Sequence, residues 1–246
     1  MWHKPPLMTA IADLLLAAGA AALLVALAVW AARLPMFPLR EVLVQQELKQ
    51  VRRAEVEYAL AGLLRGNFFS INVDNVRQAL EKLPWVRRAE VRRRWPASLE
   101  VSIEEQLAVA RWGDDLAQWV NPYGEVFTAT PPQDGSEKLP LLQGPNGSSV
   151  EVLRRYAEFS QTLATIAHRP VQLSLSQRLA WHLLLEDGMA VELGREQQKA
   201  PITARLGRFV EVYPTALAGL KPRPSVVDMR YPNGYALLPV GQGHRN

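Results

Sequence analysis

The chain of 246 residues contains no cysteine. Without thiols it can form neither disulfides nor thiolate metal sites, and a cysteine nucleophile is excluded. Histidine is also scarce, and no two of the four histidines have the four-residue spacing of a helical metal site. We therefore expect no bound metal.

Common catalytic signatures are missing as well. The sequence has no Gly-x-Ser-x-Gly, no phosphate-binding Gly-x-x-x-x-Gly-Lys and no His-Glu-x-x-His. Adjacent acids occur at Glu104-Glu105 and Asp114-Asp115, but neighbours on a strand point to opposite faces and cannot act together on one bond. We interpret these acids as solvated charges and predict a protein that is not an enzyme, with no cofactor and no small-molecule substrate.

One long apolar run stands near the start of the chain. Residues 14–32 carry no charged side chain, and only Asp13 separates this run from Ile11 and Ala12. About twenty apolar residues cross a bilayer as a helix, so we predict a transmembrane helix over residues 11–33 behind a cytoplasmic tail, 1–10. A cleaved signal peptide is the alternative, with Ala26-Leu27-Ala28 as its cleavage site, but signal peptides have shorter apolar regions.

The charge pattern leaves the orientation open, since Lys4 precedes the run and Arg33 and Arg40 follow it. A large domain behind a first apolar segment is more often translocated, so we expect the rest of the chain outside the cytoplasm. Its net charge of +4 favours an acidic protein, anionic lipid or wall polymer as partner over nucleic acid. About 210 residues follow the anchor, enough for one or two domains.

The hydrophobic periodicity predicts an α+β fold. Directly after the anchor we expect one compact strand–helix–helix–strand–strand unit, over residues 40–44, 51–63, 73–82, 86–95 and 99–105. Turn signals at Asn121-Pro122-Tyr123-Gly124, Asp187-Gly188 and Asn233-Gly234 then predict hairpins. Amphipathic helices are expected at 150–167 and 201–213, which makes the second unit a mixed sheet carrying two helices.

An arginine-rich segment is the first candidate binding feature. Five arginines, Arg87, Arg88, Arg92, Arg93 and Arg94, surround Val91. Such a strand is either a solvated sheet face or a docking surface for an acidic partner or anionic headgroups. No aromatic residues are interleaved to stack on bases, which disfavours nucleic acid.

The hairpin over residues 226–235 is the second candidate. A strand so close to the chain end often lies at a sheet edge, where unpaired backbone groups can accept another chain. Arg230 and Tyr231 are residue types enriched in binding hot spots. The alternative is that Tyr231 packs on the sheet and Arg230 is solvated.

Short motifs in order along the chain resemble the bacterial cell-division family FtsQ/DivIB. They are Leu83-Pro84-Trp85-Val86, Val91-Arg92-Arg93-Arg94-Trp95-Pro96, Leu99-Glu100-Val101, Ala110-Arg111-Trp112, Asn121-Pro122-Tyr123-Gly124-Glu125, Leu193-Gly194-Arg195, Arg208-Phe209-Val210-Glu211 and Val227-Asp228-Met229-Arg230-Tyr231. Each motif is weak alone, and their common order makes the resemblance specific.

This resemblance implies a single-pass inner-membrane protein, cytoplasmic at its N-terminus and enriched at the septum. It implies a POTRA domain over residues 39–106, a β domain over 107–240 and a tail over 241–246. Family members are scaffolds that link early division proteins to the FtsB–FtsL pair and so to septal peptidoglycan synthesis. FtsW, FtsI and FtsK are further implied partners.

The resemblance also implies particular binding residues. FtsB is expected to add a helix and a strand at the last strands, meeting Arg195, Arg230, Tyr231, Asn233, Gly234 and Leu237. A recruitment surface is expected on the POTRA strand at Arg88, Val91 and Arg93. Some members have a tryptophan where this chain has Pro239, and because proline lacks an amide donor, an added strand should lose its register there.

Two other functions stay open from the residues alone. A secreted or anchored cell-wall-binding protein would grip anionic polymer with residues 87–94, and a mature chain beginning near Val29 would favour it. An outer-membrane transporter bearing POTRA domains would need a series of amphipathic barrel strands, which we do not expect.

Overall fold

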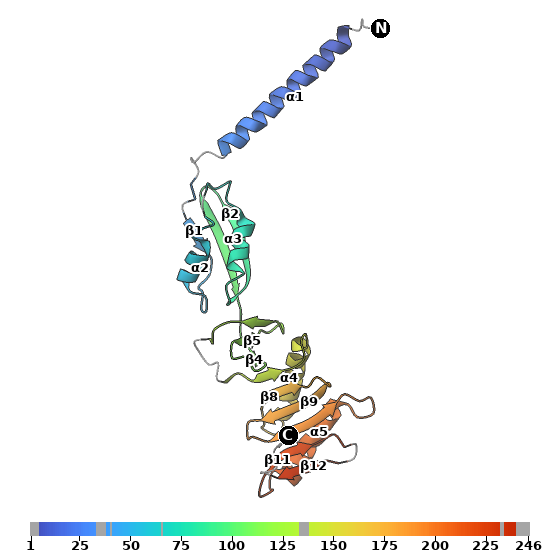
Figure 1. Ribbon diagram of the computed structural model, residues 1–246. Helices are drawn as coiled ribbons and strands as arrows, with labels where there is room; N and C mark the ends of the chain where they lie inside the picture. The colour runs from blue at the N-terminus through green and yellow to red at the C-terminus, as the bar shows by residue number, and fades with distance from the viewer. Residues whose placement is uncertain are drawn as a thin grey trace. The chain divides into compact units, whose positions relative to one another are not determined.

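The computed structural model describes residues 5–32, 38–39, 41–64, 66–132, 138–231 and 234–239. Asn233, Arg33, Arg40 and the predicted tail at 241–246 lie outside these residues. The chain divides into two compact units, residues 1–105 and 106–246. Figure 1 colours them along the chain, and each is described by itself.

The first helix, α1 (Pro5–Ala32), contains residues 11–32 of the predicted membrane segment, 11–33. Its part Met8–Ala31 has 24 residues and a mean hydropathy of 2.5, and none of it is buried inside the molecule. At about 1.5 Å per residue this part is roughly 36 Å long, enough to cross a hydrocarbon core of about 30 Å. No other part of the described chain covers this apolar surface, and a surface of this size is suited to contact with lipid.

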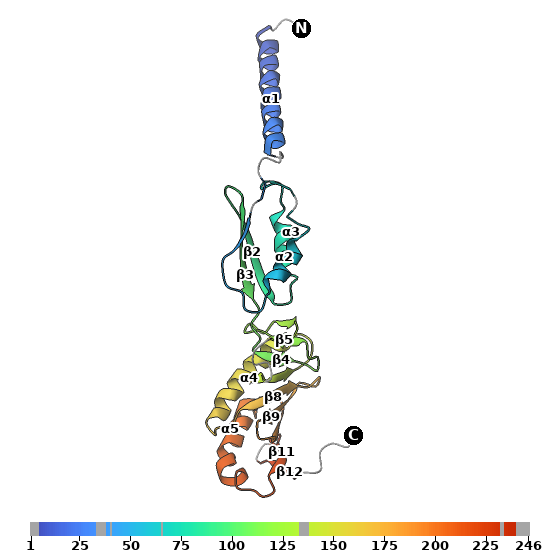
Figure 2. The same cartoon turned by 90° about the vertical axis from the view of Figure 1, so that its left-hand side faces the viewer.

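The remainder of the first unit has the predicted β-α-α-β-β order. It consists of β1 (Glu41–Val44), α2 (Arg53–Leu60), α3 (Val73–Leu80), β2 (Val86–Arg94) and β3 (Ser98–Glu105). The sheet order is β1-β3-β2, with β1 parallel and β2 antiparallel to β3. Both helices cover the same face of this sheet (Figure 2).

Alternation along β3 explains why the helices pack there. Leu99, Val101 and Ile103 are fully buried towards the helices, while the residues between them face outward. At its N-terminus α3 is capped by Asn72, whose Oδ1 accepts hydrogen bonds from the N–H groups of Asp74 and Asn75 at 3.0 and 3.2 Å.

The interpretation of Glu104 and Glu105 as solvated charges was wrong for Glu105, whereas the Glu104 side chain is 44% exposed. Glu104 pairs with Arg87 at 2.8 Å. The Glu105 carboxylate accepts hydrogen bonds from the backbone N–H groups of Lys49, Gln50 and Val51, at 2.7–3.1 Å. It therefore fixes the loop that leads into α2, a role that depends on a contact more than fifty residues away in the chain.

The second unit is a nine-stranded mixed sheet. Its strands are β4 (Ala110–Trp112), β5 (Gln118–Val120), β6 (Val126–Thr128), β7 (Leu141–Gln143), β8 (Pro170–Leu175), β9 (Ala180–Leu185), β10 (Ala190–Arg195), β11 (Pro224–Asp228) and β12 (Ala236–Pro239). Their order is β12-β11-β10-β9-β8-β7-β4-β5-β6. The predicted fold class, an α+β chain with a mixed second sheet, is thus confirmed.

Two parallel strand pairs of this sheet are joined by helices. α4 (Ser149–Ala164) connects β7 to β8, and α5 (Ile202–Val212) with the π-helical turn η2 (Tyr213–Leu217) connects β10 to β11. Both helices lie on one face of the sheet (Figure 2), as expected for two right-handed crossovers that start from strands of the same direction and step the same way across the sheet. Between helices and sheet, Phe159, Phe209 and Val191 are fully buried.

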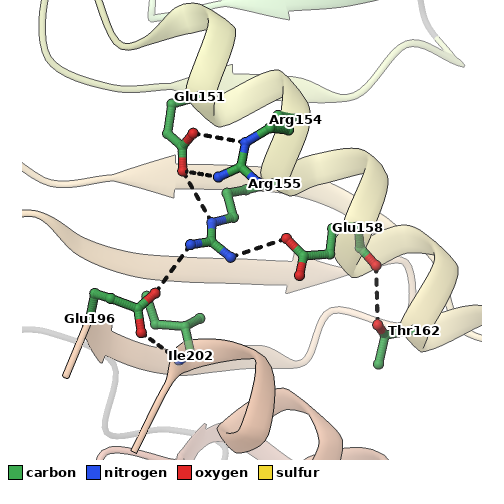
Figure 3. A network of polar contacts seen from close by, with 7 residues as sticks. All are labelled: Glu151, Arg154, Arg155, Glu158, Thr162, Glu196 and Ile202. Atoms are coloured by element: carbon green, nitrogen blue, oxygen red, sulfur yellow. Dashed lines mark hydrogen bonds and ion pairs between the residues drawn. The ribbon is translucent and has the colours of Figure 1, made fainter. Parts of the chain in front are cut away.

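A network of ion pairs holds α4 against the start of α5 (Figure 3). Arg155, only 17% exposed, contacts Glu151 at 3.1 Å, Glu158 at 3.0 Å and Glu196 at 3.2 Å. Glu196 also accepts a hydrogen bond from the Ile202 N–H at 3.0 Å, at the N-terminus of α5. The network anchors the segment that directly follows Arg195.

Candidate partner-binding edge of the second sheet

The last strand, β12, forms one edge of the nine-stranded sheet. It pairs only with β11, in the antiparallel register Val226↔Leu238, Val227↔Leu237 and Asp228↔Ala236. Its other side has no strand partner among the described residues. The terminal hairpin was expected at a sheet edge, and the structure has it there.

The ladder determines which backbone groups of β12 face outward. The Met229 N–H donates to the Glu192 carbonyl of β10 at 2.9 Å, so by alternation Val227 also faces β10. Val226 and Asp228 then bond to β12, and Leu237, opposite Val227, turns its N–H and C=O to the free edge. An incoming strand could pair with Leu237 on both groups.

Pro239 lies two positions after Leu237, so its backbone faces the same free edge. It offers a carbonyl there but no N–H, because it is a proline. It stands opposite Pro224, where the register of β11 shifts between Pro224 and Val226. An added strand can thus accept a hydrogen bond at Leu237 but not at Pro239. The expectation that its register ends at Pro239 stays a prediction, now with a defined backbone geometry.

Asp228 orients Arg230. The guanidinium donates from Nε to Oδ1 at 2.9 Å and from Nη2 to Oδ2 at 2.6 Å, and the Arg230 N–H donates to Oδ1 at 3.0 Å. The Asp228 side chain is 8% exposed and that of Arg230 is 60% exposed. These hydrogen bonds from Arg230 hold the pKa of the Asp228 carboxyl below its usual value, despite its burial.

A basic depression of about 540 Å³ lies beside this pair. Its lining includes four arginines, and none of the described residues that line it is acidic: Arg178, Ala180, Gly194, Arg195, Gln197, Arg205 and Arg230. Asp228 neutralises part of the charge of Arg230, which leaves the depression with an excess of positive charge. Such a depression is complementary to a carboxylate side chain.

Gly194 permits the approach of Arg230 to the sheet. Its φ of +73° lies in the left-handed region, and a Cβ there would stand 2.8 Å from Cγ of Arg230. Beneath it lies Arg205, which is 1% exposed. Its Nη1 donates to the carbonyls of Leu193 and Arg195 at 2.5 and 2.9 Å, and burial lowers its pKa.

Most of the residues assigned to FtsB by resemblance lie around this edge. Arg195 and Arg230 line the same depression. Tyr231 is 54% exposed, and its carbonyl accepts a hydrogen bond from Arg208 Nη2 at 3.1 Å. Leu237 is 39% exposed on β12 and Gly234 precedes that strand, while Asn233 lies outside the described residues.

The three residues expected to form a recruitment surface lie on two faces of β2. Val91 pairs with the buried Val101 and so faces the helices, as does Arg93 two positions on. Arg93 donates to the carbonyls of Phe68 and Ile71 at 3.1 and 2.7 Å. Arg88 is exposed on the opposite face, so the structure does not bring all three together.

Sequence reasoning missed three residues of the depression's framework. Asp228 lies in the terminal hairpin but was given no role, Gly194 stands in a motif that only the family resemblance singled out, and Arg205 stands in none. The spacing of Asp228 and Arg230, two apart at a strand end, was the one available signal. Among the described residues no group of three or more His, Asp or Glu side chains could hold a metal.

The Asp228–Arg230 pair predicts a pH dependence. A carboxyl with a depressed folded-state pKa stabilises the fold above its unfolded pKa of about 3.9, and this contribution is lost as the pH falls through the folded value. We expect Asp228→Asn to lower the stability of the second unit at pH 7 by about 1 kcal/mol, since the partner is largely exposed. Thermal unfolding from pH 7 to pH 2.5 should show the two proteins converge; a constant gap would contradict the linkage.

Two family models match the chain. The model "POTRA domain, FtsQ-type" matches residues 37–106, and "Cell division protein FtsQ/DivIB, C-terminal" matches residues 110–230. They cover the two units described above apart from α1 and the last strand.

Relatives that align over most of their length agree with these models. "Cell division protein FtsQ" of Burkholderia pseudomallei is 37% identical over 241 residues, 98% of this chain and 95% of the relative. The protein of the same name from Bordetella pertussis is 35% identical over 254 residues (96% and 92%), and that from Shewanella oneidensis 40% over 200 residues (81% and 73%). The chain therefore belongs to the FtsQ/DivIB family of cell division proteins.

Proposed function

We propose that this chain is a non-enzymatic scaffold of the division septum that links early division proteins to FtsB and FtsL. Its N-terminus is cytoplasmic, α1 spans the inner membrane, and its bulk lies in the periplasm as a POTRA domain, 39–106, and a β domain, 107–240. Family membership supports the role in cell division, and the single apolar helix supports a single-pass membrane arrangement.

The partner is inferred from two features, the free edge of β12 and the basic depression beside it. An extended FtsB segment pairs with Leu237, and an acidic side chain of FtsB enters the depression between Arg195 and Arg230. Main-chain hydrogen bonds then supply affinity, and the charge complementarity fixes the register. Tyr231, Asn233 and Gly234 flank the added strand.

The POTRA strand β2 is the proposed recruitment surface. Since Arg88 and Val91 face opposite sides, a protein partner contacts the outer face at Arg88. Val91 and Arg93 act indirectly, by positioning the strand and the loop at Phe68. FtsK, FtsW and FtsI are candidates for contacts with the remaining surfaces.

Calorimetry of the full chain in detergent micelles with the periplasmic segment of FtsB tests the proposal. We expect saturable binding that Tyr231→Ala weakens by about 2 kcal/mol, because an exposed tyrosine beside the edge is a typical hot spot. Tyr123→Ala is the matched control, since Tyr123 is 59% exposed on a turn far from β12 in the sheet order. Binding unaffected by Tyr231→Ala would refute the site, and no binding to a folded chain would refute the partner.

A further inference from the structure

An exposed aromatic cluster stands at one end of the POTRA sheet. Trp95, in the β2–β3 turn, is 67% exposed and Phe69 is 45% exposed. Both rings pack edge-on against the buried Phe68, at centroid distances of 6.0 and 5.2 Å. Such packing holds two large rings next to each other at the surface in a fixed arrangement.

Two arginines close to this cluster in the chain lie on the outer face of β2. Arg92 and Arg94 precede Trp95 and alternate with Arg93 along β2, and their side chains are 75% and 61% exposed. Their carboxylate partners, Glu90 at 3.0 Å and Glu100 at 4.0 Å, are exposed ion pairs that contribute little and can exchange for another anion. Arg93 binds the carbonyls of Phe68 and Ile71 and so ties the aromatic loop to the strand.

The chain itself keeps this cluster near the membrane helix. Pro38 forms a β-bridge with Asn67, the residue before Phe68. Pro38 is only six positions after Ala32, the last residue of α1. An extended chain covers at most about 3.6 Å per residue, so the bridge lies within about 22 Å of the end of the helix, whatever the path of the chain between them.

We propose that this cluster, defined as Phe69, Trp95, Arg92 and Arg94, docks on the surface of the bilayer that holds α1. Trp95 and Phe69 lie at the level of the headgroups, where amphipathic aromatic rings are favoured. Arg92 and Arg94 bind the phosphates of anionic lipids, each contributing about a fivefold gain in affinity. The short tether supplies a high effective concentration, so weak contacts suffice to hold the domain on the lipid.

The inference rests on α1 spanning a bilayer and not on FtsB. Docking would set the orientation of the POTRA domain relative to the membrane. It would also keep the recruitment strand β2 at a constant distance from the bilayer. A soluble anionic polymer is the competing ligand for the arginines, but it gives no reason for two exposed aromatic rings placed beside the membrane tether.

Brominated-lipid quenching of the full chain in nanodiscs tests the proposal. The emission of Trp95 is obtained by subtracting the emission of Trp95→Phe from that of the wild type. This subtraction removes the signal of Trp30 in the membrane helix, and phenylalanine keeps a ring against Phe68. With one third phosphatidylglycerol, brominated near the headgroup, we expect at least half of the Trp95 emission to be quenched. Arg92→Glu with Arg94→Glu should reduce this quenching at least threefold.

Arg53→Glu is the charge control, with half the charge change of the double variant. Arg53 is 90% exposed and begins α2 beside the loop held by Glu105, at the opposite end of β3, roughly 23 Å away along the strand. It should leave the quenching unchanged. If Arg92→Glu with Arg94→Glu lowers the thermal midpoint of the domain, Arg92→Gln with Arg94→Gln is used instead. We expect this variant to reduce the quenching too, but by less.

Three results would overturn the proposal. The first is unquenched Trp95 emission in anionic nanodiscs. The second is an equal loss of quenching in Arg53→Glu, which would indicate a general charge effect. The third is a response of Trp95 to soluble polyglutamate without any response to brominated lipid, which would assign the cluster to a polymer.

Discussion

Arg230→Glu should weaken the affinity of the full chain for FtsB by about 2 kcal/mol or more, roughly thirtyfold. The substitution removes a cation from the depression that Arg195 shares, and it places a carboxylate where the acidic side chain of the partner would enter. It also deprives the buried Asp228 of its bidentate partner. Attraction is thus replaced by repulsion at the centre of the proposed contact.

The control for this variant separates binding from folding. Arg53→Glu makes the same charge change on an exposed arginine of the first unit and should leave the affinity unchanged. Because Asp228 loses its partner, the thermal midpoint of Arg230→Glu is measured first, and Arg230→Gln serves if the second unit is destabilised. A reciprocal Glu→Arg or Asp→Arg change in FtsB should restore part of the affinity. Unchanged affinity in a folded Arg230→Glu protein would refute the contact.

Leu237→Pro should lower the affinity for FtsB at least tenfold with little effect on stability. The Leu237 N–H faces the free edge and is not used by β11, so proline removes a donor only from the incoming strand. Affinity measured by calorimetry, with circular dichroism as the check of folding, distinguishes this loss from unfolding.

Two further variants serve as controls for Leu237→Pro. Leu237→Ala removes the side chain but keeps the N–H, so any further loss in Leu237→Pro reports the backbone bond. Leu238→Pro removes an N–H that bonds to Val226 of β11 and should destabilise the terminal hairpin itself. Equal affinities of the alanine and proline variants at position 237 would show that no strand adds at this edge.

The elements that could be predicted from the sequence are those with local signals. Asn72 capped α3, Asp187-Gly188 joined β9 and β10, and alternation identified the buried side of β3. The strand β8 was missed although Leu173 and Leu175 alternate with more polar residues along it. The strand β7 has only three residues, too few to show a period, and it is defined by its pairing with β4 and β8, which no window of sequence contains.

The framework of the candidate site could be predicted only in part, for the same reason. Arg230 and Tyr231 were identified by residue type and their place near the chain end. The burial of Arg205 and the close approach of Arg230 to Gly194 arise from contacts between α5, β10 and the end of β11. Alternation along β2 already places Arg88 and Arg93, five positions apart, on opposite faces, and only the family resemblance grouped them as one surface.

Amide hydrogen exchange at Leu237, with and without the periplasmic segment of FtsB, tests the central claim most directly. In the free chain this N–H faces solvent at an edge, and it should exchange rapidly compared with that of Val227, which lies inside the sheet. On binding we expect strong protection at Leu237. Saturating FtsB that leaves the exchange at Leu237 unchanged would contradict strand addition at β12.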